Sequence, residues 1–318
     1  MSGPIRWLLR RVLTLPPDEA SGAERGFAEC APELRLRLDG IGRTVVEGHH
    51  AALAARDPDE LAETLERVSR EQRGFAFEGA AMGLALMDWM TCRGLRRWRA
   101  FRERHALQHD YMIHVGAGLA CARLRRGLEL PLGEADPLLG ALVADGYGFH
   151  DGFFAAEATL KAARAPQRVM GAAARAYDCG LGRSLWFVRS ASPDGIAATI
   201  TRLAPARQRD LWSGVGLACA YAGGLEHGDI ARLKQLAGPH APDLAQGAAF
   251  AAEARVRANT APEHTRSACE VLCGCDEVAA AAAARAARED LPAATDGSAF
   301  IEWRVRLREH FVPEVVAS

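Results

Sequence analysis

The sequence has no excess of charge of either sign. Its 39 basic and 40 acidic residues give a net charge of −1 at pH 7. A basic surface for nucleic acid is therefore not expected, and no acidic run predicts a disordered tail. With 49% hydrophobic and 25% charged residues, the composition is that of a soluble globular protein.

Long hydrophobic runs are also missing, so the sequence predicts no membrane span. The N-terminal stretch GPIRWLLRRVLTLPP is basic and apolar, but arginines interrupt it too often for a secretory signal. We expect a short terminal helix that packs on the domain. The alternative is an amphipathic helix that contacts a membrane surface through Trp7, Leu8 and Val12.

The cysteines do not have the pattern of a disulfide framework. All eight are irregularly spaced, and Cys121 and Cys219 lie in runs of small apolar residues, where cysteine acts as a small hydrophobic side chain. A chain of this length does not need disulfides for stability. We therefore expect a reducing compartment, the cytoplasm.

Strand patterns and common catalytic loops are absent as well. No stretch alternates between apolar and polar residues beside a hairpin turn. The segment GAGLACARL at Gly116 lacks the preceding strand and the lysine of a phosphate-binding loop. In GLGRS at Gly180 the serine comes last, whereas a nucleophile elbow has it in the middle. Helical spacing of apolar residues instead predicts an all-α fold.

What the sequence does contain is a repetition. The segments FEGAAMGLALM, VGAGLACA and DGYGF match DCGLGRSLWFV, SGVGLACA and QGAAF in the same order, with offsets of 101, 98 and 101 residues. Because solenoid units are shorter, this spacing predicts a pseudo-twofold duplication of a ~100-residue helical unit within one compact domain. The expected regions are N-terminal helices at 1–70, copy one at 71–170, copy two at 171–275 and C-terminal helices at 276–318.

Glycine and proline positions predict the local structure. We expect a turn at 40–43, a helix at 60–73 capped by Asp57, and an interruption of the third helix of copy one at 145–148. Glycine weakens a helix. The recurrence of glycines at 116 and 118, and again at 214 and 216, therefore indicates close helix contact near the pseudo-twofold axis.

The two copies differ in their ionisable residues, which lie in apolar helical segments. Copy one carries Glu78, His114, Asp145 and His150, where copy two has Cys179, Trp212, Gln246 and Ala251. Ionisable groups in such segments are costly unless they are paired or functional. We expect the four residues of copy one to converge as an acid/base cluster, or as ligands of a divalent metal.

The alternative is structural, with Glu78 and Asp145 forming ion pairs with Arg183 and Arg255 between the copies. Aromatic residues near these positions favour a pocket for an apolar ligand. The expected substrate-binding residues are Tyr111, Phe149, Arg183, Trp186, Asp210, Trp212, Gln246 and Arg255.

Six ordered motifs carry a resemblance to a known family. They are FEGAAMGLALMD, YMIHVGAGLACARL, DGYGFHDGFF, GLGRSLWF, DLWSGVGLACAYAGG and QGAAFAAEAR. Over about residues 25–311 the chain resembles the UnbL-like family, domain of unknown function 1702. Cys179 departs from the family pattern, in which glutamine is expected.

The resemblance implies a place in bacterial secondary metabolism beside enediyne polyketide synthases, but it supplies no reaction and no catalytic residues. We expect an accessory enzyme that tailors or cyclises an apolar, polyene-derived intermediate. The alternative is a non-catalytic carrier that shields such an intermediate or docks on other proteins of the polyketide cassette.

Overall fold

The fold is built from α-helices, and the part of the chain that the structure describes contains no strand. The structure is a computed structural model, and it describes residues 7, 10–92, 94–128, 135–162, 165–167, 169–291, 294 and 296–312. The all-α prediction is confirmed.

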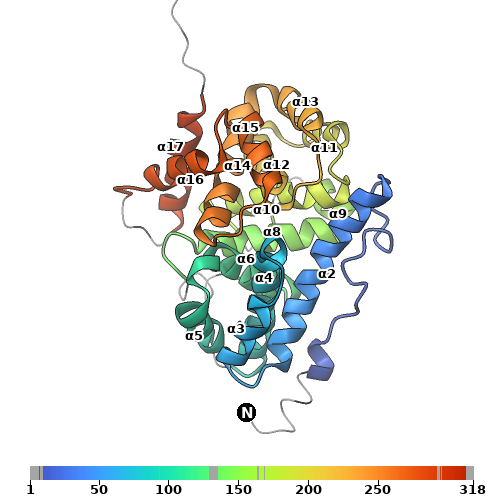
Figure 1. Ribbon diagram of the computed structural model, residues 1–318, viewed down its shortest axis with the longest axis vertical. Helices are drawn as coiled ribbons and strands as arrows, with labels where there is room; N and C mark the ends of the chain where they lie inside the picture. Colours follow the sequence, from blue (N-terminus) through green and yellow to red (C-terminus); the bar gives the residue numbers. More distant parts are fainter. Residues whose placement is uncertain are drawn as a thin grey trace, which may run out of the picture.

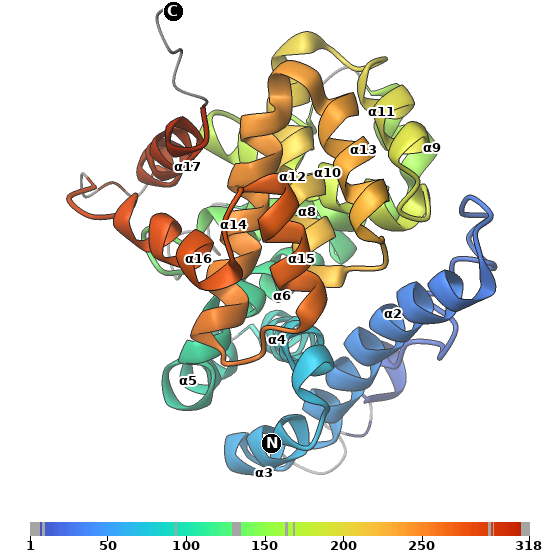
Figure 2. The same ribbon diagram turned by 45° about the horizontal axis from the view of Figure 1, so that its top comes forward.

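Core helices follow one another along the chain, and each packs on the next (Figure 1). They are α2 (Pro32–Ala54), α4 (Arg70–Met90), α6 (Asp110–Arg123), α8 (Ala141–Phe154), α10 (Ala172–Val188), α12 (Pro205–Ala222), α14 (Ala241–Arg257) and α16 (Glu277–Ala286). In Figures 1 and 2, α4, α6, α8 and α10 occupy the middle of the molecule, α2 lies along one edge and α16 lies at the opposite side.

Shorter elements connect the core helices and cover them. They are α3 (Pro58–Glu66), α5 (Arg96–His105), η1 (Leu107–His109), α9 (Ala156–Lys161), α11 (Pro193–Ile200), α13 (His227–Ala237), η2 (Gly238–His240) and α15 (Glu263–Leu272). The last helix, α17 (Ser298–His310), packs against α10, α14 and α16.

Small triplets, G-x-G or G-x-A, set the spacing between core helices from α4 to α14. In α10, a Cβ added at Gly180 would lie 1.7 Å from the carbonyl oxygen of Asp145 on α8. A Cβ at Gly182 would lie 2.1 Å from the carbonyl oxygen of Leu211 on α12. The first position thus faces the preceding helix and the third faces the next. Glycine is required here because the helices approach too closely for a side chain.

The triplets show a shorter repeating unit than the sequence comparison predicted. They begin at residues 79, 116, 146, 180, 214 and 247, so successive triplets lie 30 to 37 residues apart. Three such intervals make the offset near 100, and the predicted pseudo-twofold duplication is not shown. The expected close contact of Gly116, Gly118, Gly214 and Gly216 is confirmed, but it joins successive helices.

Three local expectations need correction. Helix α2 continues through the predicted turn at 40–43, and α8 continues through the predicted interruption at 145–148. Tertiary packing explains the glycines of α8, since a Cβ at Gly146 would lie 2.1 Å from the carbonyl oxygen of Val115 on α6. In α2, a Cβ at Gly42 would lie 2.6 Å from the Cβ of Ala20, whereas Gly40 meets no atom within 4 Å. The predicted helix at 60–73 is divided between α3 and α4. Its Asp57 cap is confirmed, since the carboxylate accepts a 2.9 Å hydrogen bond from the backbone N–H of Glu60.

The row of core helices curves, so that the end of α14 contacts the start of α4. Arg255 of α14 donates a 2.6 Å hydrogen bond to the carbonyl oxygen of Glu71, and Arg70 donates to the carbonyl oxygen of Asn259 just beyond α14. The core helices therefore surround a common interior.

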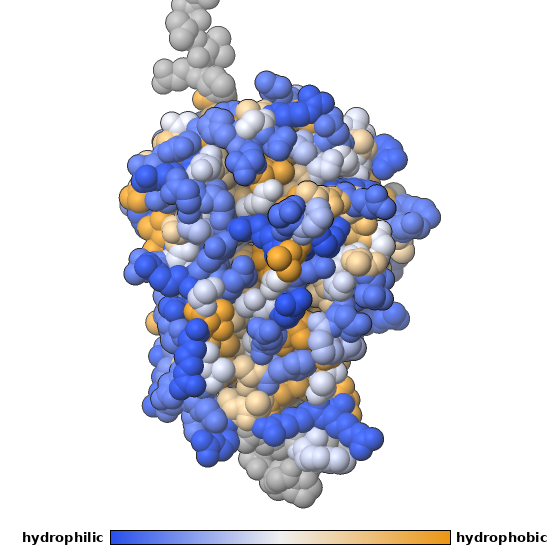
Figure 3. Space-filling model, turned by 45° about the vertical axis from the view of Figure 1, so that its right-hand side comes forward, coloured by the Kyte–Doolittle hydropathy of each residue, from blue (hydrophilic) through white to orange (hydrophobic). Residues whose placement is uncertain are grey.

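The described N-terminal residues include both exposed and buried apolar side chains. Trp7 and Val12 are exposed and Leu13 is buried, whereas Leu8 lies outside the described residues. On the face shown in Figure 3, hydrophilic residues predominate and the hydrophobic ones form separate patches. Among the described helices, none is long and apolar enough to cross a bilayer. Contact of this region with a membrane surface stays a prediction.

Candidate functional site

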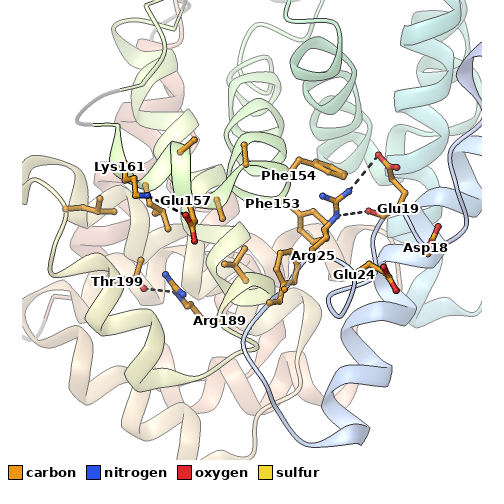
Figure 4. A pocket seen from close by; sticks show the side chains of 18 of the residues that line it. Asp18, Glu19, Glu24, Arg25, Phe153, Phe154, Glu157, Lys161, Arg189 and Thr199 are labelled. Carbon is orange, nitrogen blue, oxygen red and sulfur yellow. Dashed lines mark hydrogen bonds and ion pairs between the residues drawn. The ribbon is translucent and has the colours of Figure 1, made fainter.

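A broad cleft opens between residues 16–27 and the ends of α8 and α10, beside α9 and α11 (Figure 4). This outer cleft has a volume of about 1070 Å³. Charged side chains of both signs line it, namely Asp18, Glu19, Glu24, Arg25, Glu157, Lys161, Arg189 and Arg202. Its surface is therefore not selective for one sign of charge.

Residues 13–27, called the strap below, cross the molecule without forming a helix beyond Leu13. Two neighbouring histidines of α2 hold its beginning. The backbone N–H of Leu15 donates to Nε2 of His50 at 3.1 Å, and Nε2 of His49 lies 2.7 Å from the carbonyl oxygen of Leu13. Farther along, the backbone N–H of Gly22 donates to the carboxylate of Asp39 on α2.

Arg25 of the strap lies against two aromatic rings at the end of α8. Its guanidinium is 4.1 Å from the ring centre of Phe154 and 5.6 Å from that of Phe153 (Figure 4). Its Nε donates a 2.7 Å hydrogen bond to the carbonyl oxygen of Glu19, whose carboxylate accepts a 3.0 Å bond from Arg123 of α6. These contacts join the strap to α6 and α8.

Behind this contact lies a smaller hollow, the inner chamber, with a volume of about 80 Å³. It shares Glu19, Phe153 and Phe154 with the outer cleft, so the two hollows meet at these side chains. Side chains of α2, α4, α6, α8 and α10 enclose it, and most are apolar, including Ile41, Val46, Phe75, Met82, Leu119, Phe149 and Phe187.

Glu78 of α4 lines the inner chamber, and its side chain is only 3% exposed. No hydrogen bond to its carboxyl group is present among the described contacts. Burial raises its pKa to about 7; the positive charge of Arg183 lowers the pKa and the negative charge of Asp145 raises it further. Glu78 is therefore a carboxyl group that can hold or release a proton near neutral pH.

Arg183 of α10 and Asp145 of α8 form a buried ion pair beside Glu78. Nη2 of Arg183 donates a 2.5 Å hydrogen bond to Oδ1 of Asp145, and the guanidinium lies 4.8 Å from the ring centre of Phe149. Burial raises the pKa of Asp145, while the charge of Arg183 lowers it. The predicted ion pair between Asp145 and Arg183 is thus present.

Arg183 also reaches a second, deeper hollow of about 20 Å³, which has room for about one water molecule. This deep cavity is lined by Asp145 and by residues of α6, α12 and α14, among them Tyr111, whose hydroxyl has no hydrogen-bonding partner in the described structure. Arg183 therefore separates the inner chamber from the deep cavity.

The structure brings together six of the residues predicted for the site. They line the inner chamber or the deep cavity, and they are Glu78, Asp145, His150, Tyr111, Phe149 and Arg183. His150 is at the edge of this group, with Nδ1 3.5 Å from the Asp151 carboxylate and its ring 4.7 Å from that of Phe154.

His114 does not join this cluster. Its Nδ1 lies 2.7 Å from the carbonyl oxygen of Asp110, and its Nε2 accepts a 3.2 Å hydrogen bond from the backbone N–H of Asp136. Because Nε2 accepts, Nδ1 is the ring nitrogen that donates, to the carbonyl oxygen of Asp110. Both nitrogens are engaged in holding α6 to the residues before α8.

The other predicted substrate-binding residues are bonded within the core. Asp210 pairs with Arg175 and with Arg304 of α17, which also approaches Oε1 of Gln246 at 3.3 Å. Trp186 donates to the carbonyl oxygen of Gly223.

Trp212 and Arg255 are the remaining predicted substrate-binding residues, and they also lie outside the two hollows. Trp212 is 3% exposed and lines neither hollow. Arg255 donates to the carbonyl oxygens of Glu71 and Tyr221, and its expected pairing with a carboxylate of copy one is absent from the described contacts.

A metal centre is not assembled from the predicted ligands. In the described ranges, no group of three or more His, Cys, Asp or Glu side chains has the arrangement of a metal site. Glu78, His114, Asp145 and His150 therefore do not form one ligand set.

Sequence reasoning missed the residues that close the inner chamber. Arg25, Glu19 and Arg123 come from segments that were assigned only to packing, and Phe154 was not singled out. The available signal was the polar stretch after Pro16 and Pro17, which has no helical period although it precedes a well-patterned helix.

Comparison with known proteins gives the family of the chain. Residues 4–311 match the family model described as "Protein of unknown function (DUF1702)". No curated protein matches, and no solved structure matches. The match spans nearly the whole chain, so this protein belongs to the DUF1702 family, whose function is unknown.

Proposed function

We propose that this protein is an enzyme that binds an apolar small molecule in the inner chamber and uses Glu78 for proton transfer. The observation that carries the proposal is the state of Glu78, a buried carboxyl group that lines the inner chamber, has no hydrogen bond among the described contacts and has a pKa of about 7. General acid/base catalysis is most efficient when the pKa lies near the working pH.

The neighbouring residues support this role. Arg183 and Asp145 place a fixed ion pair beside Glu78, and such a pair can stabilise charge that develops in a transition state. The mostly aromatic and aliphatic lining is less polar than water, which strengthens electrostatic interactions. An elongated molecule in the outer cleft would reach Glu78 by passing Phe153 and Phe154.

The family resemblance suggests the biological setting. We propose that the substrate is a polyene-derived intermediate of enediyne-type or related bacterial polyketide metabolism, that the enzyme tailors or cyclises it, and that the reaction takes place in the cytoplasm. Other proteins of the polyketide cassette are the proposed partners.

A second candidate is a non-catalytic carrier that shields a hydrophobic intermediate. The observation that favours it is the composition of the inner chamber, whose lining contains no serine, threonine, cysteine or lysine and whose histidine, His150, lies at the edge beside the carboxylate of Asp151. A carrier needs only an apolar, protected hollow.

Glu78→Gln separates the two candidates, because it keeps the shape of the side chain and removes the titratable proton. We would measure product formation in a producing bacterium and, with purified protein, binding of methyl parinarate, a fluorescent apolar tetraene ester. Glu63→Gln on the exposed face of α3 is the matched control.

Loss of product with retained binding supports the enzyme. Retained product together with retained binding supports the carrier. If neither the wild type nor the variant binds the probe, the inner chamber is not a ligand site and both candidates fail.

A further inference from the structure

Arg183 has hydrogen-bonding capacity that the protein does not use. The guanidinium carries five N–H groups, and its hydrogen bond among the described residues goes to Asp145. Its Nε is buried without a partner. The residue is 7% exposed and lines both the inner chamber and the deep cavity.

Glu78 adds a second donor to the lining of the inner chamber. In its protonated form the carboxyl group presents one O–H, and no hydrogen bond from it is present among the described contacts. The chamber thus contains unused donors, and the rest of its lining is apolar apart from the paired Glu19 and Arg123 and the edge residue His150. An unsatisfied buried donor costs free energy that a ligand acceptor would recover.

The charges in this region already balance. Asp145 neutralises Arg183 through their 2.5 Å contact, and a protonated Glu78 carries no charge. An anionic ligand group would bring one uncompensated negative charge into an apolar hollow, which is strongly unfavourable. An uncharged acceptor oxygen satisfies the donors without this cost.

We infer that the ligand presents an uncharged carbonyl oxygen, that of a ketone, aldehyde or ester, to Glu78 and Arg183, with the adjoining carbons along the chamber wall formed by Phe149 and Met82 and the rest of its apolar chain in the outer cleft. This inference rests on the proposed function. It narrows the substrate to apolar molecules that carry a carbonyl group at the end that enters the inner chamber.

The test compares three probes of equal chain length, 2-nonanone, nonane and nonanoate, by displacement of methyl parinarate at a pH below 7. Two variants remove the donors. Glu78→Leu removes the O–H, and Arg183→Met combined with Asp145→Asn removes the guanidinium without leaving an unpaired charge. Met82→Leu is the control, because it changes the wall and neither donor.

We expect each donor variant to weaken 2-nonanone binding about tenfold while nonane binding changes less than about twofold, since one hydrogen bond contributes about that factor. A carbon-13 label should also show the carbonyl infrared band of bound 2-nonanone moving to lower frequency in the wild type and in Met82→Leu.

Two results would overturn the inference. One is tighter binding of nonanoate than of 2-nonanone to the wild type. The other is an equal loss of ketone and alkane binding in both donor variants. If no probe binds to the wild type, the proposed function fails as well, so the two failures are distinguishable.

Discussion

The protonation of Glu78 has a measurable effect on stability. In an unfolded chain this carboxyl group titrates near its ordinary pKa of 4.5, whereas in the folded protein burial raises the pKa to about 7. Between these values the folded state binds one proton more than the unfolded state. The free energy of unfolding therefore falls as pH rises through this interval.

The magnitude follows from the same two pKa values. At about 1.4 kcal/mol per pH unit, an interval of about 2.5 units corresponds to ~3 kcal/mol. The Glu78→Gln variant has no ionisable group at this position, so its free energy of unfolding does not fall over this pH interval. We expect the variant to match the wild type near pH 4.5 and to be more stable by up to ~3 kcal/mol above pH 7.

Urea unfolding followed by helical circular dichroism, repeated at several pH values, measures this difference. Glu63→Gln on the protein surface controls for removal of an acidic charge and should give a small difference at all pH values. A constant difference between Glu78→Gln and the wild type would refute the reasoning. So would a variant that is less stable than the wild type at high pH, because Glu78 would then be ionised and satisfied in the folded protein.

Two further predictions concern packing and charge. Gly180→Ala should lower stability by at least ~2 kcal/mol or prevent folding, since its Cβ would lie 1.7 Å from the carbonyl oxygen of Asp145. Gly40→Ala, which meets no atom within 4 Å, should raise stability by up to ~1 kcal/mol; equal thermal midpoints for the two variants would contradict this. Asp145→Asn should cost ~3–5 kcal/mol because Arg183 loses its counter-charge. It should also shift the pH dependence that Glu78 causes to lower pH, and an unchanged pH profile would show that Asp145 does not act on Glu78.

The sequence predicted the fold class because helix formation has a local signature. Apolar residues recur at helical spacing, and strand patterns are missing. The course of individual helices was harder to predict. Gly40, Gly146 and Gly148 weaken an isolated helix, so they were interpreted as a turn and an interruption. In the structure, Gly146 and Gly148 each meet the backbone of an adjacent helix, a contact that no local pattern encodes.

The site was predicted where a charge in an apolar segment signalled it, as for Glu78, Asp145 and Arg183. The same signal was misleading for His114, because the carbonyl oxygen of Asp110, one helical turn earlier, and the backbone N–H of Asp136, beyond the end of α6, satisfy its two ring nitrogens. Arg25 gave no such signal. Its position depends on a long-range contact with the end of α8, and its charge is unremarkable in a polar segment.

The return of α14 to α4 has a consequence for dissecting this protein. Both hollows lie between segments from distant parts of the chain, with Glu78 on α4, Arg183 on α10 and Tyr221 on α12 around them. A fragment ending before α10 would leave Asp145 without its counter-ion and the chamber open to solvent. The proposed ligand binding therefore depends on helices from both halves of the chain, and separately expressed halves should bind the ligand only after they reassemble.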